Sequence, residues 1–119
     1  MAHTVKFWGV RGSFTTLDKD KIEIGAHSSC VEVRTFDNKL IIFDSRTGFD
    51  PLLNSLLKDP KSPKSIDILV SHFHWDHIIS YLGFTPFFSD KFKCNIFGKE
   101  YKLSIEQIFK HIHNFTFWP

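Results

Sequence analysis

Residues 71–78 read SHFHWDHI, and this short segment decides how the whole sequence is interpreted. Three of the chain's seven histidines and one aspartate fall within six consecutive residues. The cluster consists of His72, His74, Asp76 and His77. It directly follows IDILV (66–70), an apolar run typical of a buried strand. Imidazole nitrogens and carboxylate oxygens are ligands for zinc, manganese and iron. We therefore interpret the cluster as part of a metal site rather than as surface histidines gathered by chance.

The alternation of side chains along a strand indicates how the cluster is arranged. Side chains at positions i and i+2 share one face of a strand, so His72 and His74 are expected side by side. The chain then turns, and Asp76 and His77 are expected to point into the same region. A catalytic zinc typically has three protein ligands, and two ions would need roughly six by the same count. Four ligands exceed the need of one ion and fall short of the need of two.

The sequence before the cluster predicts three strands. They are expected at 3–10, 28–36 and 40–44, because β-branched and aromatic residues alternate or run together there. The last two are expected to pair as a hairpin around the turn at 37–39. Residues 11–27 are predicted to form a long loop.

Helical spacing appears on both sides of the cluster. The first helix is predicted to have Asp50 as its N-cap and Pro51 as its first residue. Its expected buried stripe is Leu52, Leu53, Leu56 and Leu57. After the cluster we expect a short helix that ends near Gly83, a strand at 93–97, and a helix that begins with a capping box at 104–107. The apolar positions of that last helix are Ile105, Ile108, Phe109 and Ile112.

Composition restricts the classes of protein that this chain can represent. A content of 42% hydrophobic and 24% charged residues indicates a globular protein. The net charge of +2 is too balanced to indicate a nucleic-acid or membrane partner. The N-terminus lacks the apolar run of a signal peptide, so a cytoplasmic location is expected. Cys30 and Cys94 match no metal-binding spacing and are expected to be free thiols.

Against this background, SHFHWDHI resembles the His-x-His-x-Asp-His motif of the metallo-β-lactamase fold. The chain also resembles one bacterial branch of that superfamily in FWGVRGS (7–13), SSCVEV (28–33), LIIFDSRTG (40–48) and FWP (117–119). That branch includes metal-dependent hydrolases near phosphodiesterases and ribonuclease Z-like enzymes. The resemblance covers nearly the whole chain. It implies an α/β fold, the N-terminal half of an αββα sandwich, with a mixed sheet and helices on one face.

The resemblance also implies roles for individual residues. His72 and His74 would ligate a first metal ion, and Asp76 and His77 a second. Asp76 would have the catalytic role of orienting a metal-bridging hydroxide. Asp44 would brace the motif segment by hydrogen bonds, although an ordinary aspartate that caps the end of a strand is an equally open interpretation. The implied cofactor is a divalent metal, zinc with manganese or iron as alternatives, with two ions in the complete site.

Several departures from the family pattern bear on these roles. Complete members carry another histidine, a bridging aspartate and a last histidine after the motif, so residues 1–119 are expected to be a single, truncated domain. Arg46 stands where relatives carry glycine, and His27 where they tend to carry asparagine. Both are candidates for the rim of the site, although a solvated loop position is the simpler interpretation of His27. A second His-x-His, at 111–113, is predicted to lie at a helix end, where i and i+2 do not share a face.

The expected function is therefore a metal-dependent hydrolase. It would act on phosphodiester or related ester bonds through a metal-bound hydroxide, and its site would be incomplete in this chain. The alternative is a non-catalytic remnant or a metal-binding interaction module that pairs with another chain. The expected assemblies are a homodimer or a complex with a complementing second half. A ribonuclease Z-like role is disfavoured by Trp75, and a true β-lactamase by the absence of Gly-Gly at 78–80.

Overall fold

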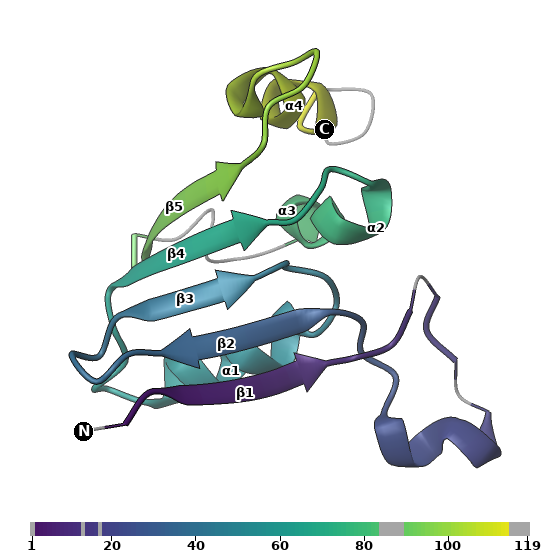
Figure 1. Cartoon of the computed structure of the whole chain (residues 1–119), viewed down its shortest axis with the longest axis vertical. Helices are drawn as coiled ribbons and strands as arrows, with labels where there is room; N and C mark the ends of the chain where they lie inside the picture. Colours follow the sequence, from purple (N-terminus) through teal and green to yellow (C-terminus); the bar gives the residue numbers. More distant parts are fainter. Residues whose placement is uncertain (1, 13, 17, 84–89, 115–119) are drawn as a thin grey trace.

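The computed structural model of this chain describes residues 2–12, 14–16, 18–83 and 90–114. A single five-stranded sheet forms the centre of the described structure, with strand order β1-β2-β3-β4-β5 (Figure 1). The strands are β1 (Thr4–Gly9), β2 (Cys30–Arg34), β3 (Leu40–Phe43), β4 (Ser65–Val70) and β5 (Lys93–Gly98). β1, β2 and β3 pair antiparallel, whereas β3, β4 and β5 pair parallel. The prediction of an α/β fold with a mixed sheet is confirmed.

Helices connect the parallel strands. The helical elements are the 3₁₀-helix η1 (Lys19–Ile24) and the α-helices α1 (Phe49–Lys58), α2 (Trp75–Ile78), α3 (Ser80–Gly83) and α4 (Ile105–Ile112). The 3₁₀-helix lies in the segment predicted as a loop. None of its residues is buried, so the sequence has no periodic apolar pattern there that would predict a helix. In the described part of the chain, no helix is both long and apolar enough to cross a membrane.

Helix α1 begins earlier than predicted and buries a different stripe. Its N-cap is Gly48, so Asp50 lies inside the first turn instead of capping it. The turn starts early because the amide of Phe49 already donates to the carbonyl of Arg46 at 2.8 Å. The fully buried Phe49 takes the place predicted for Leu57, which is 45% exposed at the edge of the stripe. The buried residues of α1 are Phe49, Leu52, Leu53 and Leu56.

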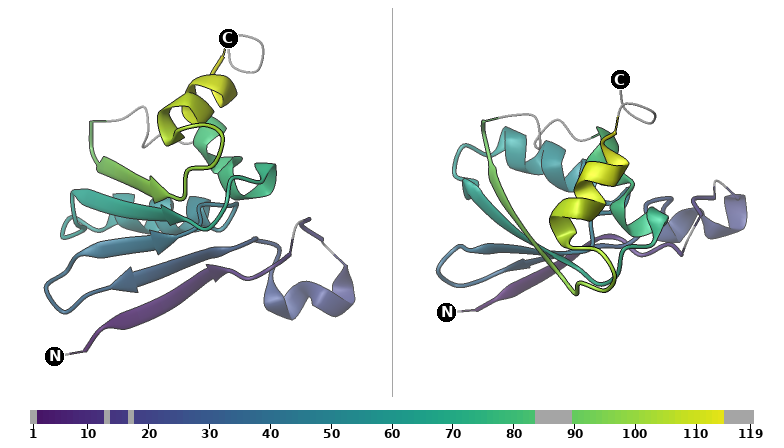
Figure 2. Two further views of the ribbon diagram at one scale, coloured as in Figure 1. Left: turned by 45° about the horizontal axis from the view of Figure 1, so that its top comes forward. Right: turned by 90° about the horizontal axis from the view of Figure 1, so that it is seen from above.

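Helix α4 begins at the predicted capping box. The Ser104 hydroxyl accepts from the amide of Gln107 at 3.2 Å, and the Gln107 side chain accepts from the amide of Ser104 at 2.8 Å. Phe109 of this helix packs edge-on against Tyr81, with 4.8 Å between the ring centroids. Figure 2 shows α1 and α4 on the same side of the sheet.

The two faces of the sheet have different environments. The face toward α1 carries the core, with Leu40, Ile42, Ile66, Ile68 and Val70 all buried. The strand registers place a second apolar set on the opposite face, namely Val5, Phe7, Val31, Val33, Ile41, Phe43, Leu69 and Phe97. All eight are exposed or only half-buried. We call this set the open face, because none of the described helices covers it.

Candidate functional site

The histidine cluster lies where β4 ends. Its segment leaves the sheet at the carboxyl edge of the parallel strands β3 and β4, the edge at which open α/β sheets usually bind ligands. His74 is the N-cap of α2 and has an extended backbone, with φ −66° and ψ 147°. The amide of His77 donates to the carbonyl of His74 at 2.9 Å. Asp76 and His77 therefore lie on the first turn of α2, whereas His72 and His74 precede it.

The three imidazoles of the cluster are in contact. The ring centroids of His72 and His74 are 4.5 Å apart, and those of His72 and His77 are 3.9 Å apart. Burial, followed by the proximity of His77 and His74, lowers the pKa of His72 below its ordinary value. This shift favours the neutral form of His72, which is the form of imidazole that binds metals.

Asp44 connects the end of β3 to the motif segment. One carboxylate oxygen accepts from the amide of Ser71 and the other from its hydroxyl, each at 2.8 Å. The second oxygen also lies 3.1 Å from Nδ1 of His77. The backbone of Asp44 is left-handed, with φ 56°, a conformation that aspartate tolerates better than most residues. Asp44 thus orients both the start and the end of the motif.

Arg46 contacts the cluster directly. Its side chain is buried, its Nε donates to the carbonyl of Asp76 at 2.7 Å, and its Nη2 donates to the Asp76 carboxylate. Desolvation opposes ionisation of Asp76, but its own backbone amide and the Arg46 charge outweigh it, so the pKa of Asp76 lies below its ordinary value. The sequence placed Arg46 at the rim, whereas in the structure it is a buried partner of a motif residue.

The loop that carries Arg46 is fixed against residues 28–29. The amide of Gly48 donates to the carbonyl of Ser28 at 3.1 Å, and the hydroxyl of Thr47 accepts from the amide of Ser28 at 2.9 Å. A Cβ atom at Gly48 would lie 2.8 Å from the carbonyl oxygen of Ser28, closer than real Cβ contacts. This close approach restricts the position of the loop that carries Arg46.

The other histidines have separate environments. His27 contributes its backbone carbonyl, which accepts from the amides of Val10 and Arg11, each at 3.1 Å, and its side chain is exposed. Nδ1 of His111 lies 2.8 Å from the carbonyl oxygen of Gln107, within α4. The ring nitrogens of His113 lie 3.0 Å from the carbonyl oxygens of Phe109 and Tyr81. The contact between His113 and Tyr81 connects the end of α4 to α3.

The donor types suit a divalent metal, but the arrangement is incomplete. In the part of the chain that the structure describes, no group of three or more histidine, cysteine, aspartate or glutamate side chains could hold an ion. Asp76 is paired with Arg46, and His77 faces Asp44. His72 and His74 are the pair that fits an ion best, and further ligands would have to come from outside the described residues.

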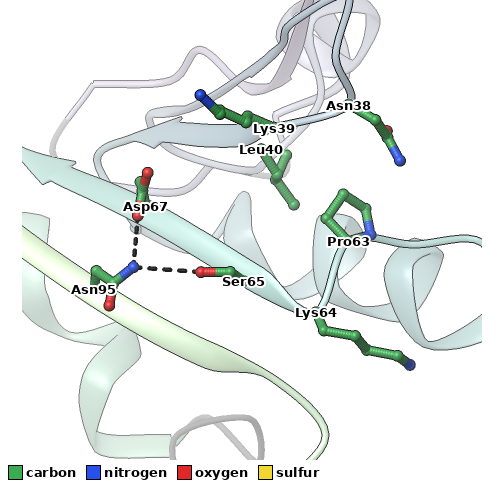
Figure 3. Close-up of a pocket in the computed structure, with 8 residues that line it drawn as sticks. All are labelled: Asn38, Lys39, Leu40, Pro63, Lys64, Ser65, Asp67 and Asn95. Carbon is green, nitrogen blue, oxygen red and sulfur yellow. Dashed lines mark hydrogen bonds between the residues drawn. The ribbon is translucent and has the colours of Figure 1, made fainter.

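Two of the hollows in the described part of the chain lie near the ends of the sheet. A hollow of about 290 Å³ adjoins Asp76 and is lined by Phe14, Thr15, Ser28, Thr47, Trp75, Asp76 and Ile79. A larger hollow of about 480 Å³ lies at the amino end of β3 and β4 (Figure 3), and its lining includes Lys39, Lys64, Asp67 and Asn95. There the Asn95 amide donates to Asp67 at 2.7 Å. The hollow beside Asp76 is the one that bears on the chemistry, because it alone of these two adjoins the cluster.

Sequence reasoning did not find two of these features. Trp75 is 52% exposed and lines the hollow beside Asp76, although its place within the motif gives it no ligand role. Ser71 was not singled out, although it contacts Asp44 and His72. Its position between a buried strand and the first histidine was the available signal. The segment FWP (117–119) lies outside the described residues.

Comparison with known proteins adds no support for the resemblance to the metallo-β-lactamase fold. No family model matches this chain, and neither a curated protein nor a solved structure is significantly similar to it.

Proposed function

We propose that this chain is a metal-dependent hydrolase of the metallo-β-lactamase type, acting on phosphodiester or related ester bonds. The observation that carries the proposal is the gathering of His72, His74, His77, Asp76 and Asp44 at the carboxyl edge of β3 and β4. Within the α/β class, this proposal implies that the chain folds as one half of an αββα sandwich. The open face supports it, because a sandwich buries the corresponding apolar face between two sheets.

The residues around the cluster have distinct tasks in this proposal. His72 and His74 would hold the ion, with zinc as the first choice and manganese or iron as alternatives. The Ser71 hydroxyl lies 3.0 Å from Nδ1 of His72, which leaves Nε2 of that ring for the ion. Asp44 keeps Ser71 and His77 in place. A divalent ion supplies activation of water near neutral pH and neutralisation of charge on the attacked group.

The hollow beside Asp76 supports a small substrate. Trp75 and Phe14 offer exposed aromatic surface at 52% and 89% exposure, and the hydroxyls of Ser28 and Thr47 lie at the same hollow. Ser28 and Thr47 are hydrogen-bonded to each other at 3.1 Å and are thus pre-oriented. An apolar hollow with a few fixed polar groups is the usual form of a small-molecule site.

Hydrolysis of bis(p-nitrophenyl) phosphate with added zinc or manganese tests the proposal. We expect metal-dependent turnover that is lost in His74→Ala and retained in the control His111→Ala. If a second copy completes the ligand set, the rate will rise more steeply than in proportion to protein concentration. Turnover no greater than that of the metal salt alone, both for this chain and after addition of a chain carrying the remaining ligands, would contradict the proposal.

A non-catalytic, metal-binding interaction module is the second candidate. The specific observation in its favour is the open face, on which Phe7 is 65% and Phe97 is 52% exposed. Large apolar patches of this kind typically mark interaction surfaces. Zinc binding without turnover, in a chain that associates with a second copy or a complementing half, would favour this candidate over the hydrolase.

A further inference from the structure

The ion pair between Arg46 and Asp76 is unusual in its burial. The Arg46 side chain is only 4% exposed, and arginine is almost never this buried unless it is paired. It uses two donors on one residue, Nε on the carbonyl oxygen and Nη2 on the carboxylate of Asp76. The pair joins the loop before α1 to the first turn of α2, thirty residues apart in the sequence.

This pair affects how Asp76 could serve a metal ion. A carboxylate that turns toward an ion would leave the buried guanidinium without its partner, and a buried charge that loses its partner is strongly destabilising. The guanidinium would also repel a divalent cation bound to the same carboxylate, since both charges would lie within a few ångströms in a partly buried place. The pair therefore opposes metal coordination by Asp76 in two ways.

His72 and His74 are not subject to this opposition. His72 contacts the Ser71 hydroxyl, and His74 is exposed at the N-cap of α2. His77 occupies an intermediate position, with Nδ1 beside Asp44 and Nε2 3.8 Å from the Asp76 carboxylate. The Arg46 guanidinium thus contacts the cluster at Asp76 and leaves His72 and His74 available to an ion.

We propose that the Arg46 guanidinium acts as a built-in counter-ion that takes the place of a second metal ion, so that the cluster binds a single divalent ion through His72 and His74. Arg46 is in this account a positioning residue that sets the metal stoichiometry. The inference rests on the metal binding in the proposed function, but it concerns the number of ions and the part of Asp76 rather than the reaction.

Calorimetric titration with zinc chloride, without any substrate, tests this inference. The wild-type chain should bind one ion, and Asp76→Asn should change its Kd by less than about threefold, because this carboxylate is not a ligand while Arg46 holds it. Arg46→Met removes the charge and keeps most of the side-chain length. It should bind a second ion or bind zinc at least about tenfold more tightly, since Asp76 becomes available. The double variant Arg46→Met/Asp76→Asn should lose that gain.

Arg34→Met is the matched control, because Arg34 also forms an ion pair, with Glu32 at 2.9 Å, on another part of the sheet. It should bind zinc as the wild type does. If Arg46→Met does not fold, Asp76→Asn alone decides: an unchanged Kd supports the inference, and a tenfold or greater loss overturns it. Wild-type binding that Arg46→Met leaves unchanged would overturn this inference alone. A lack of zinc binding in both the wild type and Arg46→Met would contradict the proposed function as well.

Discussion

The Asp44 carboxylate holds Ser71, the residue before the first motif histidine, through two hydrogen bonds of 2.8 Å. Asp44 follows β3 and Ser71 follows β4, so these bonds join the carboxyl ends of two adjacent parallel strands. The same carboxylate reaches His77 at 3.1 Å. The geometry of the histidine cluster therefore depends on one side chain that does not belong to the motif.

Replacing Asp44 should weaken both folding and metal binding. Asp44→Ala removes both acceptors and places alanine at a φ of 56°, so we expect a loss of about 1–3 kcal/mol in the free energy of unfolding. Zinc affinity should fall roughly 10–100-fold, as is typical when a group that orients a ligand is removed. Urea denaturation and calorimetry measure the two effects. Asp37→Ala, in an exposed turn, is the control, and equal effects of the two variants would contradict the role given to Asp44.

The close contact at Gly48 predicts a size limit in the loop that carries Arg46. Gly48→Ala would bring a Cβ atom to 2.8 Å from the carbonyl oxygen of Ser28, and the backbone would have to shift. We expect a loss of about 1–3 kcal/mol in unfolding free energy, the usual effect of overpacking. Gly12→Ala is the matched control, because nothing lies within 4 Å of a Cβ atom there. A variant as stable as the wild type would show that this contact is not tight.

The two thiols give a pH-dependent readout of folding. Cys30 and Cys94 are free, as predicted. Burial, with smaller contributions from the Glu32 and Asp44 charges, raises the pKa of Cys30 to about 12, and burial raises that of Cys94 to about 11. Both thiols should therefore react slowly with a disulfide reagent at pH 8 and react fully in urea.

The raised pKa values of the two thiols also predict how the free energy of unfolding changes with pH. Above pH 9, an unfolded chain loses thiol protons that the folded chain retains, so the free energy of unfolding should fall as pH rises from about 9 toward 12. Cys30→Ser tests this, because its stability should fall less steeply with alkaline pH than that of the wild type. Parallel pH profiles for the two proteins would exclude Cys30 as a source of the dependence.

The open face should promote association. Phe7→Ser and Phe97→Ser each remove an aromatic side chain that is more than half exposed on this face. If the face pairs with a second copy, light scattering should find a dimer for the wild type and a shift toward monomer in both variants. Tyr101→Ser is the control, since Tyr101 is 72% exposed but lies outside the strands. A wild type that is monomeric at high micromolar concentration would contradict pairing with itself.

The sequence was sufficient to locate most of the strands and helices but not the way in which they pack against one another. Alternation found β2, the apolar run found β4, and the Ser104–Gln107 spacing found the start of α4. These signals are local, because a periodic pattern reports which side of one element is buried. The early start of α1 was missed, since it depends on Phe49 filling a core position that other elements create.

The sequence was sufficient to predict which residues form the site but not which side chains contact one another there. The motif brought His72, His74, Asp76 and His77 together, and the structure also gathers them. The ion pair of Arg46 with Asp76 spans thirty residues and depends on how a loop packs against Ser28. No local pattern encodes such a pairing, so an arginine in place of glycine indicated only that the site departs from the resemblance.

The central claim is that the motif histidines bind a divalent ion, and a zinc titration of paired variants tests it most directly. The wild type and His111→Ala should bind zinc with the same Kd, because His111 faces the carbonyl of its own helix. His72→Ala and His74→Ala should each weaken binding by more than about tenfold, since each removes a direct ligand. Equal binding by all four proteins, or no binding by the wild type, would contradict the claim.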